Sequence, residues 1–211
     1  EVRPDLVVGI PAQAALVAPL RRAGVRVVLL PDDSYDDIFA DLRALGTLSG
    51  HAAEARALIA RLHTQVAQIT ARVPRGLQPR VFIVLGVDPI FTAGGHSYID
   101  RLIAFAGGRN VAANLHVAYS RYSAEALVAA QPDVLIADSE SGLGAVLSRP
   151  PWSLLRAVRR GRVAILRDPD LLDRPSPRFV DGLRWLVAKL HPVVPARRWP
   201  IAGVGADGVA P

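Results

Sequence analysis

Short apolar runs and amphipathic stretches alternate along most of the chain. The runs Leu6–Gly9 and Val134–Ala137 are continuous rather than alternating, which is typical of strands buried on both faces of a parallel sheet. Each run follows a Pro-Asp pair, Pro4-Asp5 or Pro132-Asp133, a combination that ends the preceding element in a turn. The pattern therefore indicates an internal duplication.

The segments that follow the two copies also match. Ala12–Ala23 reads as a helix and Val25–Leu30 as a strand after the first copy. After the second copy, a helix over about Pro151–Arg160 leads to a strand over Val163–Leu166. Strand, helix and strand joined by short links form a βαβ unit with parallel strands, so the sequence predicts two similar lobes.

More strands and helices precede the second copy than precede the first. It consists of a strand over Arg80–Gly86, a helix over Ser97–Ala106, a strand over Asn110–Ala112 and a helix over Ser123–Ala130 that begins at a serine cap. The equivalent part of the first lobe would precede residue 1. We therefore expect roughly 50 residues of that lobe to be missing from this chain, judged by the length of the segment that precedes the second copy.

An amphipathic helix is predicted between the lobes. Apolar residues recur at three- and four-residue steps over His51–Val73, with Ser49 as the expected N-cap and a shorter helix over Tyr35–Ala44 before it. The fold class that follows is α/β, with two Rossmann-like lobes of parallel-sheet βαβ units joined by one long spine helix. The predicted boundaries are residues 1–48 for an incomplete N-terminal lobe, 49–74 for the connecting helix, 75–195 for the C-terminal lobe and 196–211 for a tail.

Composition narrows the class of protein. The chain has 211 residues, of which 51% are hydrophobic, so it is able to bury a packed core. It contains no cysteine, which excludes thiolate catalysis, cysteine-ligated metal and disulfides within it. No apolar run approaches the roughly 20 residues of a membrane-spanning helix. The formal charge of +6 comes from 25 basic and 19 acidic residues, and the arginine-rich stretch Arg149–Arg167 is interpreted as a solvated helix face rather than a nucleic-acid surface.

Several segments, in order and at matching intervals, resemble the solute-binding proteins of cobalamin and ferric-chelate ABC importers. They are Pro4–Val8, Tyr35–Ile38, Leu45–Gly50, Phe91–Asp100, Ala106–Val111, Tyr119–Glu125, Gly161–Val163 and Asp168–Arg178. The resemblance implies two α/β lobes on a helical backbone, a ligand cleft between them and an extracytoplasmic location, with no signal in this chain. It also implies an ABC permease dimer as partner and cobalamin, haem or a ferric siderophore as ligand, with no cofactor required.

The ligand is expected beyond the carboxyl ends of the strands, as in other open parallel sheets. The loops there are Gly9–Pro11, Asp32–Tyr35, Val87–Thr92, Asp138–Ser141 and Asp168–Arg174. Aromatic side chains suit a flat chelate, so the candidates are Tyr35, Phe91 and Tyr98, although each also suits ordinary packing.

A proline-bounded loop supplies three further binding candidates, Asp170, Asp173 and Arg174. In related chains this loop borders the ligand, while Asp and Pro also form turns unaided. His96 is a weaker candidate, as an axial ligand, because a lone loop histidine is ordinarily solvated.

The remaining histidines lack metal-ligand spacing, so we predict no zinc site. No catalytic motif and no glycine fingerprint for nucleotides occurs, so we expect no enzymatic activity, and a nucleotide-using α/β enzyme is the least favoured alternative.

The acidic residues available for docking on a permease differ from those of the family. Relatives use one acidic residue on each lobe near the helix after the Pro-Asp strand, which basic residues of the transporter receive. Glu140 would serve on the second lobe, whereas no acid occurs between Asp5 and Asp32 on the first. A truncated or degenerate relative that binds nothing and acts as a partner module is therefore the main alternative.

Overall fold

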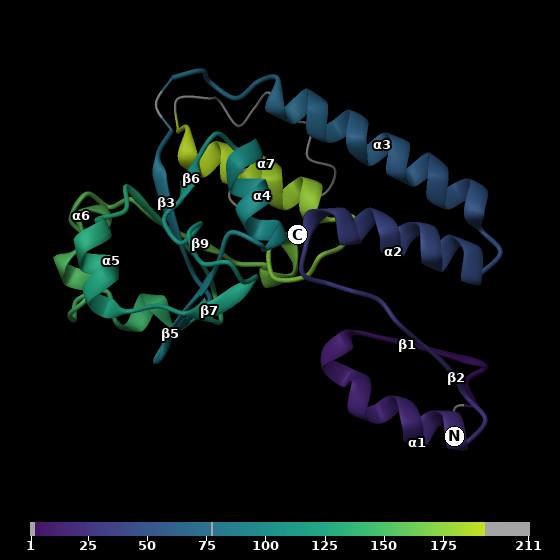
Figure 1. The fold of residues 1–211 in the computed structure, drawn as a ribbon. Helices are drawn as coiled ribbons and strands as arrows, with labels where there is room; N and C mark the ends of the chain where they lie inside the picture. The colour runs from purple at the N-terminus through teal and green to yellow at the C-terminus, as the bar shows by residue number, and fades with distance from the viewer. Residues whose placement is uncertain (1–2, 77, 193–211) are drawn as a thin grey trace.

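The computed structural model describes residues 3–76 and 78–192. Its body is built on a four-stranded parallel sheet with the order β6 (Arg109–Asn110), β3 (Arg80–Val84), β8 (Val134–Asp138) and β9 (Val163–Leu166). Val81 pairs with Val134, and Leu135 pairs with Val163. All five residues of β8 are buried, which explains its continuous apolar sequence. The α/β class with parallel βαβ units is confirmed (Figure 1).

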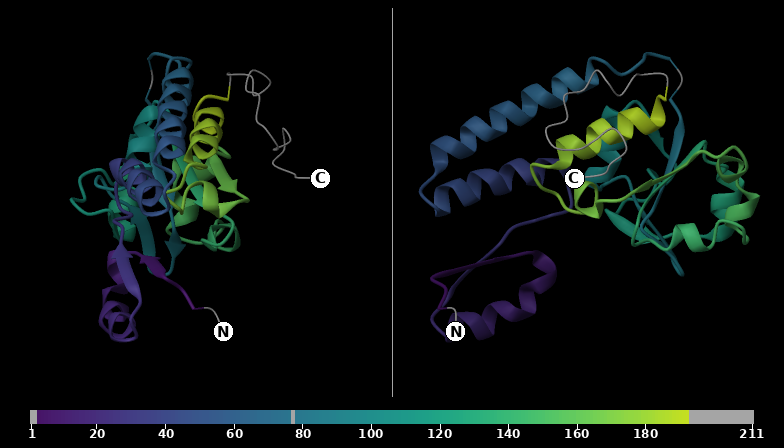
Figure 2. Two further views of the ribbon diagram at one scale, coloured as in Figure 1. Left: turned by 90° about the vertical axis from the view of Figure 1, so that its right-hand side faces the viewer. Right: turned by 180° about the vertical axis from the view of Figure 1, so that it is seen from behind.

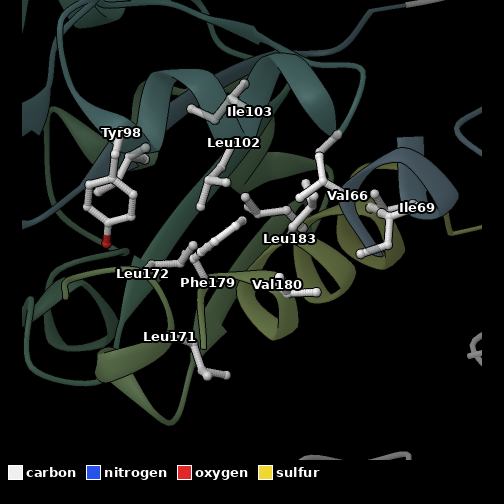
Figure 3. Packing of buried hydrophobic residues seen from close by; sticks show 14 of the residues in the cluster. Val66, Ile69, Tyr98, Leu102, Ile103, Leu171, Leu172, Phe179, Val180 and Leu183 are labelled. Carbon is white, nitrogen blue, oxygen red and sulfur yellow. The ribbon is translucent and has the colours of Figure 1, made fainter. Parts of the chain in front are cut away.

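Both faces of this sheet are covered. Val81, Ile83 and Ile136 pack in one cluster with helices α4 (Tyr98–Phe105) and α7 (Phe179–Leu190), part of which Figure 3 shows from close by. Phe82 and Leu135, on the opposite face, pack in a second cluster with α5 (Ala124–Ala130) and the short helices η3 (Trp152–Leu154) and α6 (Arg156–Arg159). The body is therefore a three-layer sandwich.

Serine residues begin two of the covering helices. Ser97 Oγ accepts a hydrogen bond from the Asp100 amide at 3.1 Å, and Ser123 Oγ accepts one from the Ala126 amide at 3.1 Å. The predicted cap at Ser123 is confirmed.

A small antiparallel sheet stands beside the parallel one. It consists of β4 (Gly86–Val87), β5 (Ile90–Ala93) and β7 (Tyr119–Arg121), with Ala93 opposite Tyr119. The sequence analysis treated Val87–Thr92 as a loop, and this was wrong. Thr92 is buried and donates its hydroxyl to the Ile83 carbonyl at 2.7 Å, which fixes β5 on the edge of β3.

Helices α2 (Tyr35–Leu48) and α3 (Ala52–Thr70) lie side by side along α7 (Figures 1 and 2). The predicted N-cap at Ser49 was wrong: Ser49 ends α2 and donates its hydroxyl to the Leu45 carbonyl at 2.7 Å, while His51 precedes α3. The spine helix is thus shorter than the predicted His51–Val73. Ile38 and Phe39 of α2 lie in the same core cluster as α4 and α7, so α2 packs with the body.

The first βαβ copy stands apart from this body (Figures 1 and 2). It consists of β1 (Leu6–Gly9), η1 (Pro11–Leu16), α1 (Val17–Arg22) and β2 (Arg26–Leu29), with β1 and β2 parallel. Among the described residues of this unit only Val27 is buried, and Leu16 is 57% exposed. The unit therefore has almost no apolar core of its own.

The remaining elements are η2 (Leu143–Ala145) and η4 (Pro169–Leu171). In the described part of the chain, no helix is long and apolar enough to cross a membrane.

Some arginines of the basic stretch Arg149–Arg167 have structural partners. Arg156 pairs with Asp133, and Arg162 donates to the Leu190 carbonyl. The predicted tail, residues 196–211, lies outside the described residues.

Candidate functional site

A carboxylate marks the carboxyl end of the central strand β8. Asp138 is buried, and its Oδ1 accepts hydrogen bonds from the amides of Glu140 at 2.5 Å and Ser141 at 2.7 Å. The Ser141 hydroxyl donates to the Asp138 carbonyl at 2.9 Å. These bonds close a tight turn that holds the carboxylate at the strand end, where ligands bind in open α/β sheets.

The loop after β9 lies beside this turn. Its 3-10 turn η4 is closed by the Asp173 amide, which donates to the Pro169 carbonyl at 2.8 Å. The loop also lies tightly on α7, because a Cβ added at Gly182 would come within 2.3 Å of the Leu171 carbonyl oxygen. This close approach permits only glycine and fixes the position of Asp173.

Asp173 and Asp138 form a carboxyl pair. Loss of solvation around the Asp173 carboxyl raises its pKa to about 7, and the negative charges of Asp138 and Glu140 and a hydrogen bond with Asp138 add to the rise. The residue as a whole is nevertheless exposed. The negative charges around Asp173 therefore disfavour ionisation of its own carboxyl.

The segment that leads from β2 to α2 brings two more acids to the start of α4. Ser34 and Asp37 cap α2 reciprocally, with the Ser34 amide donating to Asp37 Oδ2 at 2.8 Å. The Tyr98 amide, at the start of α4, donates to the Asp33 carbonyl at 2.8 Å. Asp32 and Asp33 are thereby held against the body.

Two tyrosines are affected by the charges of these acids. Tyr98 is fully buried, and burial raises its pKa, followed by the effects of Tyr119 and Asp173. Burial also raises the pKa of Tyr119, on β7, followed by the charges of Asp33 and Asp32. Tyr119 thus connects the two groups electrostatically. We call the whole set the acidic site: Asp32, Asp33, Tyr98, Tyr119, Asp138, Glu140 and Asp173.

The structure brings only some of the predicted binding residues to this site. Tyr98, Asp173 and the proposed docking residue Glu140 belong to it. Arg174 is directed to its neighbour Asp170, with 2.8 Å between Nε and Oδ1, and its side chain is 77% exposed. The binding role of each of these residues stays a prediction.

The other two aromatic candidates lie elsewhere. Tyr35 is half-buried and makes edge-to-face contacts with Phe39, Phe105 and Phe179 at centroid distances of 5.1, 5.2 and 5.5 Å. Its ring therefore joins α2 to α4 and α7. Phe91, on β5, is 37% exposed and leaves a face open to a ligand.

His96 has a partner that the sequence analysis did not anticipate. Its ring lies edge-to-face with that of His116, with the centroids 5.9 Å apart, and both residues are exposed. In the part of the chain that the structure describes, no three His, Asp or Glu side chains gather as a metal-ion site. The role of His96 as an axial ligand stays a prediction.

Tyr119, Asp32, Asp33 and Asp138 were missed as site residues. Three of them fall in or beside loops that the sequence analysis had placed at strand ends, so the position of the site was available. Tyr119 reaches the site through the pairing of β7 with β5, a long-range contact without a local sequence signal.

Negative charge continues from the acidic site onto α2. Asp41 has an unpartnered buried Oδ1, and its pKa rises to about 6 through burial and then the charges of Asp37 and Asp32. Because the folded-state pKa lies above the ordinary value of 3.8, ionisation of Asp41 reduces stability as the pH rises from about 4 through 6.

The substitution Asp41→Asn is therefore expected to stabilise the protein at pH 7.5 and to have little effect at pH 4. We expect a gain of roughly 1 kcal/mol at pH 7.5, since solvent screens a partly exposed charge. Urea unfolding at the two pH values measures this, with Asp36→Asn on the exposed face of α2 as the control. An equal effect of Asp41→Asn at both pH values would show that its charge is not the cause.

A concave feature lies beside α4 and β6. It is a hollow of about 320 Å³ lined by Gln78, Asp100, Ala104, Gly108, Arg109, Asn110 and Ala113. Asn110 donates there to Asp100 Oδ1 at 3.0 Å and to the Ala93 carbonyl at 3.0 Å. Asn110 and Asp100 thus satisfy each other, and the hollow lies by β6 rather than at the carboxyl ends of β8 and β9.

Parallel strands with polar residues at their carboxyl ends are the arrangement in which open α/β folds bind ligands. Residues 1–169 match the family described as periplasmic binding protein, and the chain belongs to that family. The family consists of substrate-binding proteins of transport systems.

Two individual relatives are similar to this chain over most of its length. The chain is 31% identical over 186 residues to a cobalamin-binding protein of Halobacterium salinarum, covering 83% of this chain and 50% of that protein. It is 26% identical over 200 residues to the ABC transporter substrate-binding lipoprotein YvrC of Bacillus subtilis, covering 90% and 63% of the two chains. The chain thus spans about half to two thirds of the length of these relatives.

A solved structure with a similar fold is the apo form of the periplasmic heme-binding protein RhuT from Roseiflexus sp. RS-1. The TM-score is 0.79 at 28% identity, and the match covers 90% of this chain and 76% of that one.

Proposed function

We propose that the protein captures a corrinoid or a ferric chelate, haem included, and delivers it to an ABC import permease. Family membership carries the general part of this proposal, a solute-binding protein of an ABC importer. The observation that supports a ligand of this class is the similarity to a cobalamin-binding and a heme-binding protein. The acidic site at the carboxyl ends of β8 and β9 is the proposed place of binding.

Aromatic and hydroxyl groups in the acidic site and on the neighbouring strand suit a large flat ligand. Tyr119 is half-buried at the edge of the acidic site, and the exposed Phe91 lies on the neighbouring strand β5. Aromatic rings stack on or pack edge-on against a macrocycle, and hydroxyl groups bond its polar side chains.

Delivery would use the exposed Glu140 as an anchor. Glu140 stands on the turn after β8, where an acid can meet a basic residue of a permease. The first βαβ unit offers no acid between Asp5 and Asp32, so we propose one-sided electrostatic registration. The protein would act outside the cytoplasm, as expected of its family.

One observation favours a second candidate function. The first βαβ unit buries only Val27 among its described residues, so a ligand that needs two rigid walls would find one of them weak. A partner module that binds no solute is consistent with that feature.

Titration of the protein with cyanocobalamin and with haemin separates the two candidates. We expect saturable binding of at least one of them, with micromolar or tighter affinity, followed through ligand absorbance and quenching of protein fluorescence. A folded sample that binds neither these nor a ferric siderophore would contradict the proposal and favour the partner module.

A further inference from the structure

We infer that the acidic site selects its ligand by charge, accepting cationic or amide-rich neutral corrinoids and rejecting chelates that carry free carboxylates, such as haem. This inference rests on the proposed function and adds the chemical class of the ligand to it.

Among the described residues, the carboxylates of the site form no ion pair. The four ion pairs of the described residues join Arg156 to Asp133, Arg174 to Asp170, Arg178 to Asp168 and Arg184 to Asp181. Two acids of the loop after β9 are thus neutralised by arginine, whereas the acids of the acidic site have no such partner among the described residues. Their negative charge is directed to whatever occupies the site.

A buried hydroxyl points to a ligand independently of these charges. The Tyr98 side chain is fully buried, and its hydroxyl oxygen has no hydrogen-bond partner among the described residues. Figure 3 shows Tyr98 at one edge of the apolar cluster, with the oxygen pointing away from Leu102 and Ile103. The groups that act on this hydroxyl are Tyr119 and Asp173 of the same site. Buried hydroxyl groups ordinarily have a partner, so this one is available to a bound molecule or to a side chain that the molecule moves.

The local charge opposes the charge of the whole chain. The formal net charge is +6, a field that by itself attracts anions. Asp138 and Asp173, from two separate segments, nevertheless pair at the carboxyl ends of β8 and β9, and the charges of Asp33 and Asp32 also act on Tyr119 of the site. Partial desolvation and mutual repulsion already raise the pKa of Asp173 there, so an added carboxylate meets strong repulsion.

The peripheral groups of each ligand decide whether the carboxylates attract or repel it. The peripheral amides of a corrinoid donate N–H groups, which form charge-assisted hydrogen bonds to carboxylates. The propionates of haem are negatively charged and would lie against the same carboxylates. Because like charges repel, haem would bind more weakly.

The test compares three ligands of graded charge: diaquocobinamide, which is cationic, cyanocobalamin, which is neutral, and haemin, which is anionic. At low salt we expect the protein to bind the corrinoids on the order of tenfold or more tightly than haemin. The double variant Asp33→Asn/Asp173→Asn should lose about tenfold of this preference, and high salt should weaken it in the wild type.

The matched control is Asp5→Asn/Glu54→Gln, which also removes two carboxyl groups, from exposed positions outside the acidic site, and should keep the preference. Haemin binding as tightly as the corrinoids, or a preference unchanged in the double variant, would overturn the inference and leave the proposed function intact. Failure of all three ligands, and of a ferric siderophore, to bind would instead contradict the proposed function.

Discussion

Replacing Phe179 by alanine is expected to cost about 3–5 kcal/mol of unfolding free energy, which is the usual cost of deleting a buried phenylalanine. Phe179 begins α7, is fully buried and makes edge-to-face contacts with Tyr35 and Phe39 of α2. The substitution therefore empties the junction between α2 and the body. Because domains are ordinarily stable by about 5–15 kcal/mol, the variant should be close to unfolding.

Urea unfolding followed by circular dichroism measures the loss. The matched control is Phe91→Ala, a phenylalanine that is 37% exposed on β5, which should cost less than about 1 kcal/mol. Equal losses in the two variants would show that α2 does not pack on α7 in solution.

Hydrogen exchange in the first βαβ unit is expected to be at least about a thousandfold faster than in β3 and β8. The two strands of this unit are joined by a parallel ladder that includes the Leu30 amide and the Gly9 carbonyl at 2.8 Å. A two-stranded sheet without a buried face is marginally stable, so these bonds open without unfolding of the body.

Exchange followed amide by amide, or by mass spectrometry of short peptides, measures the difference. The amides of Phe82 and Leu135, in the centre of the parallel sheet, supply the protected reference. Equal protection of both regions would mean that the first unit is covered by another surface, such as a second copy of the chain.

Local sequence signals predicted most of the body but failed where structure depends on distant partners. The run of branched residues at Val134–Ala137 and the serine before Ala124 are local, and both gave the right element. The strand β5 could not be predicted, since it is held by pairing with β7 and by the bond from Thr92 to Ile83. The cap at Ser49 was misassigned because a serine hydroxyl also bonds backward to end a helix.

The candidate site shows the same division. General rules for parallel sheets placed it at the loops after β8 and β9, and Asp138 and Asp173 meet there. That Tyr119 connects these acids to Asp33 follows from a fold in which the segment before α2 bonds to the start of α4. No periodicity in the sequence carries that information.

The most direct test of the proposed function and its site is to locate bound cobalt in crystals of the protein grown with cyanocobalamin. Anomalous scattering from cobalt places the corrin ring without reference to any model of the ligand. The account predicts the cobalt against the acidic site, with the corrin amides facing Asp33 and Asp173. Cobalt in the hollow beside Asp100 and Asn110, or no ordered cobalt in crystals of folded protein at saturating ligand, would contradict it.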